Sequence, residues 1–131
     1  MRRPLLAAVA LPLLILAGCQ RLNYERDFTL DASTSQTFTI AAPRGDQKLT
    51  VTATSSKEPI IVFVVLAEDK AAGDAAAANR IQPKKALGGQ ENAKEISFEA
   101  TIPSGKEFIV YVRMGKNARG TTDVKLSVKG H

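Results

Sequence analysis

The sequence has little of what enzymes and disulfide-rich proteins depend on. It holds one cysteine, Cys19, no tryptophan, and one histidine, His131, which is the last residue. A single cysteine excludes an intramolecular disulfide bond. Nucleophilic catalysis with histidine needs an imidazole held beside its nucleophile, and a chain end is seldom held. The same scarcity leaves zinc without its usual ligands. We therefore expect a protein that is not an enzyme and has no cofactor.

Strong charge of one sign is also missing. The 131 residues carry a net charge of +5 at pH 7, and a chain of this length holds one small domain. In the predicted mature chain its basic residues concentrate at only two places, Lys84 and Lys85 with Arg80, and Lys116 with Arg119. Nucleic-acid binding usually combines such groups with aromatic residues, and neither group contains one. The sequence predicts no nucleic-acid partner, and no small-molecule substrate is evident.

The start of the chain has the form of an export signal. Arg2 and Arg3 precede an apolar run over residues 5–16, and small residues follow it. A helix that spans a bilayer needs about 20 apolar residues, and this run is shorter. Residues 1–18 are therefore predicted to be a removable signal peptide rather than a membrane span.

The residues Leu16-Ala17-Gly18-Cys19 resemble the lipobox of bacterial lipoproteins. A cysteine thiol is the strongest side-chain nucleophile for attack on a lipid donor, and small residues fit a peptidase cleft. The resemblance implies recognition of Leu16, Ala17 and Gly18 by a signal peptidase, cleavage before Cys19, and a diacylglyceryl group with further acylation, such as palmitate, on Cys19. At about 0.8 kcal/mol per buried CH₂, two or three acyl chains form a firm membrane anchor. A plain secretory leader with a chance cysteine is the alternative.

The resemblance also implies a location. A lipidated Cys19 would hold the mature protein in the cell envelope, outside the cytoplasm, with the membrane as its first partner. Gln20 follows the cysteine, and in well-studied Gram-negative bacteria an Asp at that position favours the inner membrane. The outer membrane is therefore favoured if the source is Gram-negative. We expect residues 19–27 to form a lipidated tether to a domain over 28–131.

Alternation of apolar and polar residues dominates the mature chain. Leu49, Val51 and Ala53 alternate with threonines, which is typical of a strand with one wet face. The same period of two recurs around Phe28, Phe38, Phe98, Val110 and Leu126. Turn residues separate these runs. The pattern predicts an all-β fold, a single antiparallel β-sandwich of about seven strands.

Residues 60–67 depart from this alternation because both faces are apolar. A strand covered on both sides accounts for this, and the long segment 68–90 could supply the cover as a loop or a short helix. Gly73 and Asp74 offer an N-cap for an alanine-rich helix. The alternative is an exposed patch for a partner, formed by Ile60, Val62, Val64, Leu66, Ile109 and Tyr111.

Three carboxylates are weak candidates for a hard cation such as calcium. Glu68, Asp69 and Asp74 follow the apolar strand, but their spacing matches no calcium loop and Lys70 lies among them. Helix capping and solvation are the usual roles of such residues. We expect no metal site there.

From Gln36 onward the order of strands resembles the bacterial pre-peptidase C-terminal domain. The turn Pro103-Ser104-Gly105 leads into Phe108, Val110 and Val112, and residues 123–128 form the last strand. The resemblance implies an accessory β-sandwich without catalysis of its own.

Together these features predict a lipid-anchored, extracytoplasmic, noncatalytic binding or envelope-assembly module whose partner is an envelope protein or polymer. One alternative is a structural envelope lipoprotein without a discrete ligand. The other is a calcium- or carboxylate-dependent enzyme accessory.

Overall fold

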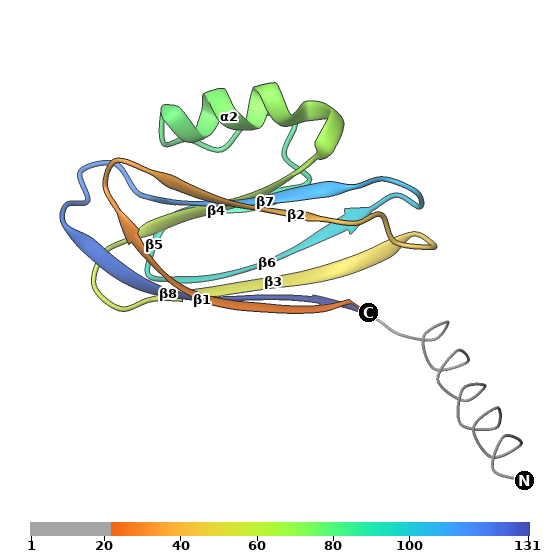
Figure 1. The fold of residues 1–131 in the computed structure, drawn as a ribbon, viewed down its shortest axis with the longest axis horizontal. Helices are drawn as coiled ribbons and strands as arrows, with labels where there is room; N and C mark the ends of the chain where they lie inside the picture. Colours follow the sequence, from red (N-terminus) through yellow and green to blue (C-terminus); the bar gives the residue numbers. More distant parts are fainter. Residues whose placement is uncertain (1–21) are drawn as a thin grey trace, which may run out of the picture.

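Residues 22–131 form a β-sandwich with one α-helix on its outside (Figure 1). The structure, a computed structural model, describes residues 22–131, so the predicted signal peptide, the lipobox and Cys19 lie outside the described residues. Two antiparallel sheets of four strands face each other. The predicted fold class, a single antiparallel β-sandwich, is confirmed.

The two sheets have similar layouts. The first sheet has the order β1-β8-β3-β6, with bounds Asn23–Asp31 for β1, Thr121–Gly130 for β8, Gln47–Ser55 for β3 and Glu95–Ile102 for β6. The second sheet has the order β2-β7-β4-β5, with bounds Ser35–Ile40 for β2, Phe108–Met114 for β7, Ile60–Leu66 for β4 and Gly88–Ala93 for β5. All neighbouring strands in the two sheets are antiparallel.

The main core lies between the sheets. On β3 the side chains of Leu49, Val51 and Ala53 are buried there, while Thr54 on the other parity is exposed. Successive side chains of a strand point to opposite faces, so alternation in the sequence becomes one dry and one wet face. The second sheet contributes Ile60, Val62, Val64, Val110 and Val112 to the same core.

The helix covers the outer face of the second sheet (Figure 1). A 3₁₀ turn, η1 (Ala67–Asp69), leads into α2 (Lys70–Ala78). Ala76 and Ala77 of α2 are buried in a second cluster, whose sheet residues are Ile61, Phe63, Val65, Ile109 and Tyr111. The prediction of a short helix within 68–90 is confirmed, and β4 is apolar on both faces because both are covered.

The start of α2 differs from the predicted N-cap at Gly73 and Asp74. The helix begins at Lys70, and Gly73 is buried inside it. A Cβ atom at Gly73 would lie 2.7 Å from the Tyr111 ring, so glycine permits the helix to approach the sheet closely. Asp74 accepts hydrogen bonds from Tyr111 and Lys70 instead of capping the helix.

Two strands depart from the predicted boundaries. The strand β1 begins at Asn23, so the sandwich starts before residue 28 and the expected tether loses residues 23–27. Arg26 is a charged residue on the side of β1 that is otherwise apolar. It is accommodated there because its guanidinium lies over the Tyr24 ring, 4.1 Å from the centroid. The strand β5 begins inside the segment 68–90, which was predicted to be a loop or a helix, and continues past its end. A Cβ atom at Gly88 would lie 2.7 Å from the carbonyl oxygen of Glu99, so glycine permits this close approach.

The sandwich has two distinct ends. Gly130 donates a backbone hydrogen bond to Leu22 at 2.9 Å, so the start of β1 and the C-terminus lie together at one end (Figure 1). We call this the entry end, and it includes the turns 41–46 and 103–107. The opposite, distal end includes the turns 32–34, 56–59 and 115–120. No helix within residues 22–131 is long and apolar enough to cross a membrane.

Candidate functional site

The outer face of the first sheet is the uncovered counterpart of the face under α2. Its side chains come from the solvent parity of all four strands and are hydroxyl-bearing or charged. They include Glu25, Asp27, Thr29, Thr50, Thr52, Thr54, Glu95, Ser97, Glu99, Asp123, Lys125, Ser127 and Lys129. Because Leu30, Val51 and Leu126 point inward, the face itself offers no apolar strip. We call this surface the open face.

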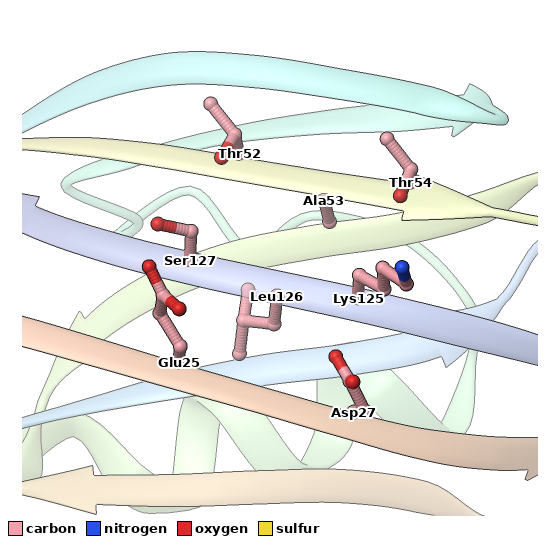
Figure 2. Close-up of a pocket in the computed structure, with 8 residues that line it drawn as sticks. All are labelled: Glu25, Asp27, Thr52, Ala53, Thr54, Lys125, Leu126 and Ser127. Atoms are coloured by element: carbon pink, nitrogen blue, oxygen red, sulfur yellow. The ribbon is translucent and has the colours of Figure 1, made fainter.

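The open face is hollowed over its middle strands. A depression of about 350 Å³ lies across β1, β8 and β3 (Figure 2). The side chains of Glu25 and Asp27 border it on one side and those of Thr52 and Thr54 on the other. Lys125 and Ser127 stand on the strand between them. A second hollow of about 260 Å³ continues along β1 and β8 toward Thr29 and Asp123.

The charges on the open face are mixed and exposed. Lys129 lies 3.7 Å from Glu25, and Lys48 lies 3.8 Å from Glu99. Thr29 donates a hydrogen bond of 2.8 Å to Asp123. Exposed ion pairs of this kind contribute little to stability. They leave hydroxyl donors and acceptors, carboxylates and an ammonium group available to a polar ligand.

The terminal histidine is held on this face, contrary to the expectation of a free chain end. The His131 backbone N–H donates to the carbonyl oxygen of Lys48 at 2.9 Å, and its Nε2 hydrogen-bonds with Thr50 Oγ1 at 2.7 Å. A triad also needs a group that orients the other ring nitrogen. Within residues 22–131 no such hydrogen bond to His131 is present.

The six residues of the predicted partner patch lie on two different faces of the second sheet. Ile60, Val62 and Val64 point into the main core, whereas Ile109 and Tyr111 point outward beneath α2. All five are buried, and Leu66 is half-buried. In the structure they do not form one exposed surface. The residues that share a face with Ile109 and Tyr111 are Ile61, Phe63 and Val65.

The three candidate metal ligands have separate partners. Glu68 pairs with Lys106 at 2.9 Å, Asp69 pairs with Lys85 at 3.4 Å, and Asp74 pairs with Lys70 at 2.8 Å. The hydrogen bond and charge of Lys106 lower the pKa of Glu68, and Lys70 together with Tyr111 lowers that of Asp74. The part of the chain that the structure describes contains no group of three or more potential metal ligands.

Part of the open face is predictable from the sequence. The alternation in β3 predicts that its threonines face solvent, whereas Glu25 and Asp27 fall in the predicted tether. The available signal was the series Tyr24, Phe28 and Leu30, which has the parity of a strand, with Arg26 as its exception. A long arginine over an aromatic ring can occupy an apolar position at a sheet edge.

Comparison with known proteins identifies the fold. No family model matches the chain, and no curated protein matches it. Among solved structures, it is similar to the pre-peptidase C-terminal domain of a collagenase from Bacillus anthracis. The two share 14% identity and a TM-score of 0.60, over 82% of this chain and 89% of that one.

Two further solved structures are similar to this chain. A mitogen from Yersinia pseudotuberculosis has 11% identity and a TM-score of 0.57, over 86% of this chain and 88% of its own. A periplasmic inhibitor of g-type lysozyme from Aeromonas hydrophila has 13% identity and a TM-score of 0.53, over 86% and 90%. At these identities the likenesses show a shared β-sandwich fold, in line with the resemblance seen in the sequence.

Proposed function

We propose that this chain is a bacterial lipoprotein whose β-sandwich is a noncatalytic binding module of the cell envelope. Residues 1–18 would be removed as a signal peptide, with Leu16, Ala17 and Gly18 as the recognition residues, and Cys19 would carry the lipid. The observation that carries this proposal is the lipobox in register with the apolar leader. The sandwich begins directly behind it, with β1 at Asn23.

The fold and the open face support a binding role for the module. In the second sheet α2 covers the outer faces of β4 and β7, while the first sheet leaves a broad hydrogen-bonding surface uncovered. A protein with a similar fold is a periplasmic inhibitor of g-type lysozyme, so its target is a protein. A hydroxyl- and carboxylate-bearing face without an apolar strip suits a polar envelope polymer or the polar surface of a protein. We propose the open face as the binding surface.

Membrane fractionation tests the anchor. The wild-type chain should sediment with the membranes and be released only by detergent. The Cys19→Ser variant lacks the thiol that would form the thioether, so it should not be processed as a lipoprotein. Salt-extractable wild-type protein, or identical membrane retention and processing of the variant, would count against a lipid anchor.

Cross-linking in intact cells tests the open face. The double variant Thr52→Arg, Ser127→Arg places two bulky charges beside the depression and should reduce the yield of a stoichiometric envelope partner at least about tenfold. Ala75→Arg, on the exposed side of α2, is the matched control and should leave that yield unchanged. If the wild-type chain has no partner at stoichiometric yield, a structural envelope component is the better description.

A further inference from the structure

Arg80 occupies a backbone conformation that arginine seldom adopts. Its φ is +54°, in the left-handed region. It follows the C-terminus of α2, where Ile81 N–H donates to Ala76 O and Arg80 N–H donates to Ala77 O, both at 3.0 Å. This is the Schellman motif, whose left-handed residue is usually glycine. An arginine in this conformation costs about 1 kcal/mol or more in backbone strain, which a glycine would avoid. The reason for an arginine here must therefore lie in the contacts of its side chain.

The Arg80 side chain reaches the distal end and meets a second arginine. Its guanidinium donates to the carbonyl oxygen of Gly115 at 3.2 Å and to that of Ala32. Arg113, from the end of β7, donates to the same Ala32 oxygen at 3.5 Å. The Nε of Arg113 is buried and has no hydrogen-bond partner among residues 22–131. Two guanidinium groups thus converge on one carbonyl oxygen with donors to spare.

These two positive charges are not neutralised locally. Every ion pair within residues 22–131 involves other side chains. The nearby Asp31 carboxylate accepts its hydrogen bonds from Ser33 and Thr34. Burial and the charge of Arg80 lower the pKa of Arg113, against a smaller opposing effect of Asp31. Both arginines are half-buried and neither is paired with a carboxylate, so an anion would be bound favourably here.

The surrounding loops extend this positive region. Connections at the distal end carry four exposed basic companions of the pair and one carboxylate, Glu58. A further carboxylate, Glu91 of β5, accepts a hydrogen bond from the backbone of Gln82, two residues beyond Arg80. The basic companions are Lys57, Lys94, Lys116 and Arg119. Glu58 accepts a hydrogen bond from the backbone of Arg119, and two further carboxylates, Asp31 and Glu95, lie at strand ends. At the entry end, the turns 41–46 and 103–107 contain one basic and one acidic residue each.

A purely structural role explains only part of this arrangement. A cation near a helix C-terminus interacts favourably with the helix dipole, and Arg80 joins α2 to two loops. One arginine is enough both to interact with the helix dipole and to join α2 to the loops. The second guanidinium, crowded against the first without a carboxylate between them, adds repulsion to the folded state.

We propose that Arg80 and Arg113 form an oxyanion site at the distal end that binds a phosphate group. A tetrahedral group with several oxygens can accept hydrogen bonds from two guanidinium groups at once, more readily than a planar carboxylate with two oxygens. The site is separate from the open face, and the inference does not depend on the lipid anchor. The phosphate is either free or part of an anionic polymer.

Titration calorimetry of the full chain, purified in nonionic detergent, tests this site with inorganic phosphate and polyphosphate as the probes. Saturable binding of either probe is expected, and the tighter arm identifies the source. Arg80→Gly removes one guanidinium and relieves the left-handed strain, so the variant should fold and bind at least about tenfold more weakly. Arg113→Gln should have a similar effect.

Lys57→Gln is the matched control, because it removes one positive charge from the same end outside the pair. Its affinity should stay within about twofold of the wild type. An equal loss in Lys57→Gln and Arg80→Gly would reduce the effect to general charge attraction and overturn the site. Absence of binding by the wild-type chain, or tighter binding of acetate than of phosphate, would also overturn the proposal.

Discussion

Tyr111 connects the helix to the second sheet through both its ring and its hydroxyl. The ring stacks on Phe63 with 4.8 Å between centroids. The hydroxyl donates its one hydrogen to Asp74 at 2.6 Å, and its oxygen lies 3.2 Å from the carbonyl oxygen of Lys70. The apolar ring therefore belongs to the second cluster while the polar tip holds α2. The sequence places Tyr111 correctly in a strand but contains no sign of its bond to Asp74.

Removal of the Tyr111 hydroxyl should weaken the fold without disturbing the ring. We expect Tyr111→Phe to lower the free energy of unfolding by about 1.5 kcal/mol, because a hydrogen bond to a carboxylate is lost. Urea unfolding measures the change. Tyr24→Phe is the control, since no hydrogen bond of the Tyr24 hydroxyl is seen within residues 22–131, and it should change stability by less than about 0.5 kcal/mol. A Tyr111→Phe variant as stable as the wild type would contradict this role.

The same hydroxyl predicts a pH dependence. Burial, and then the neighbouring Asp74, raise the pKa of Tyr111 above its ordinary value. The unfolded chain releases this proton first, so the stabilisation is complete below about pH 10 and is lost as the pH rises above it. The difference in unfolding free energy between wild type and Tyr111→Phe should stay constant from about pH 6 to about pH 9 and then shrink. A difference that grows above pH 10 would have the wrong sign.

At the scale of elements, α2 is defined more by contact than by helix propensity. Gly73 lies over the Tyr111 ring, and Ala76 and Ala77 complete the buried side. A helix of this length is marginal without packing. Its position on the sheet therefore depends on the absence of side-chain bulk along that side.

Gly73 and Ala75 should respond oppositely to exchange of glycine and alanine. Gly73→Ala should destabilise the protein by about 1–3 kcal/mol, because overpacking against Tyr111 outweighs the gain in helix propensity. Ala75→Gly, on the exposed side, should cost about 1 kcal/mol from propensity alone. Thermal unfolding of both variants decides the matter. Stabilisation by Gly73→Ala would show that the helix does not bear on the ring.

The type of each element was predictable wherever the sequence had a strong periodic pattern. The prediction failed where contacts in the fold override local composition. The apolar strand at residues 60–66 and the cover over it followed from two apolar faces. The strand β5, with sequence GGQENA, has no β-branched residue and exists because β4 offers an edge and its glycines permit close approach. The start of β1 was missed because Arg26 interrupts the alternation of Tyr24 and Phe28.

At the scale of the whole molecule, the two sheets are covered unequally. On one outer face α2 covers β4 and β7, whereas the other face is wet, hollowed and made of side chains that are far apart in the sequence. The sequence of each single strand indicates which of its residues face water. Only the register of β1, β8 and β3 brings Glu25, Ser127 and Thr52 into one row. The wet threonines of β3 could therefore be predicted, but the full open face and the Arg80–Arg113 pair could not. The lipobox pattern is local to the sequence and needs no such register.

The intact mass of the mature protein, purified from its native membrane beside a Cys19→Ser variant, tests the central claim most directly. We predict a chain that starts at Cys19 and carries the added mass of acyl chains, and we predict that both features are absent from the variant. A wild-type chain that carries no lipid, or that is cleaved at another residue, would contradict the lipid anchor.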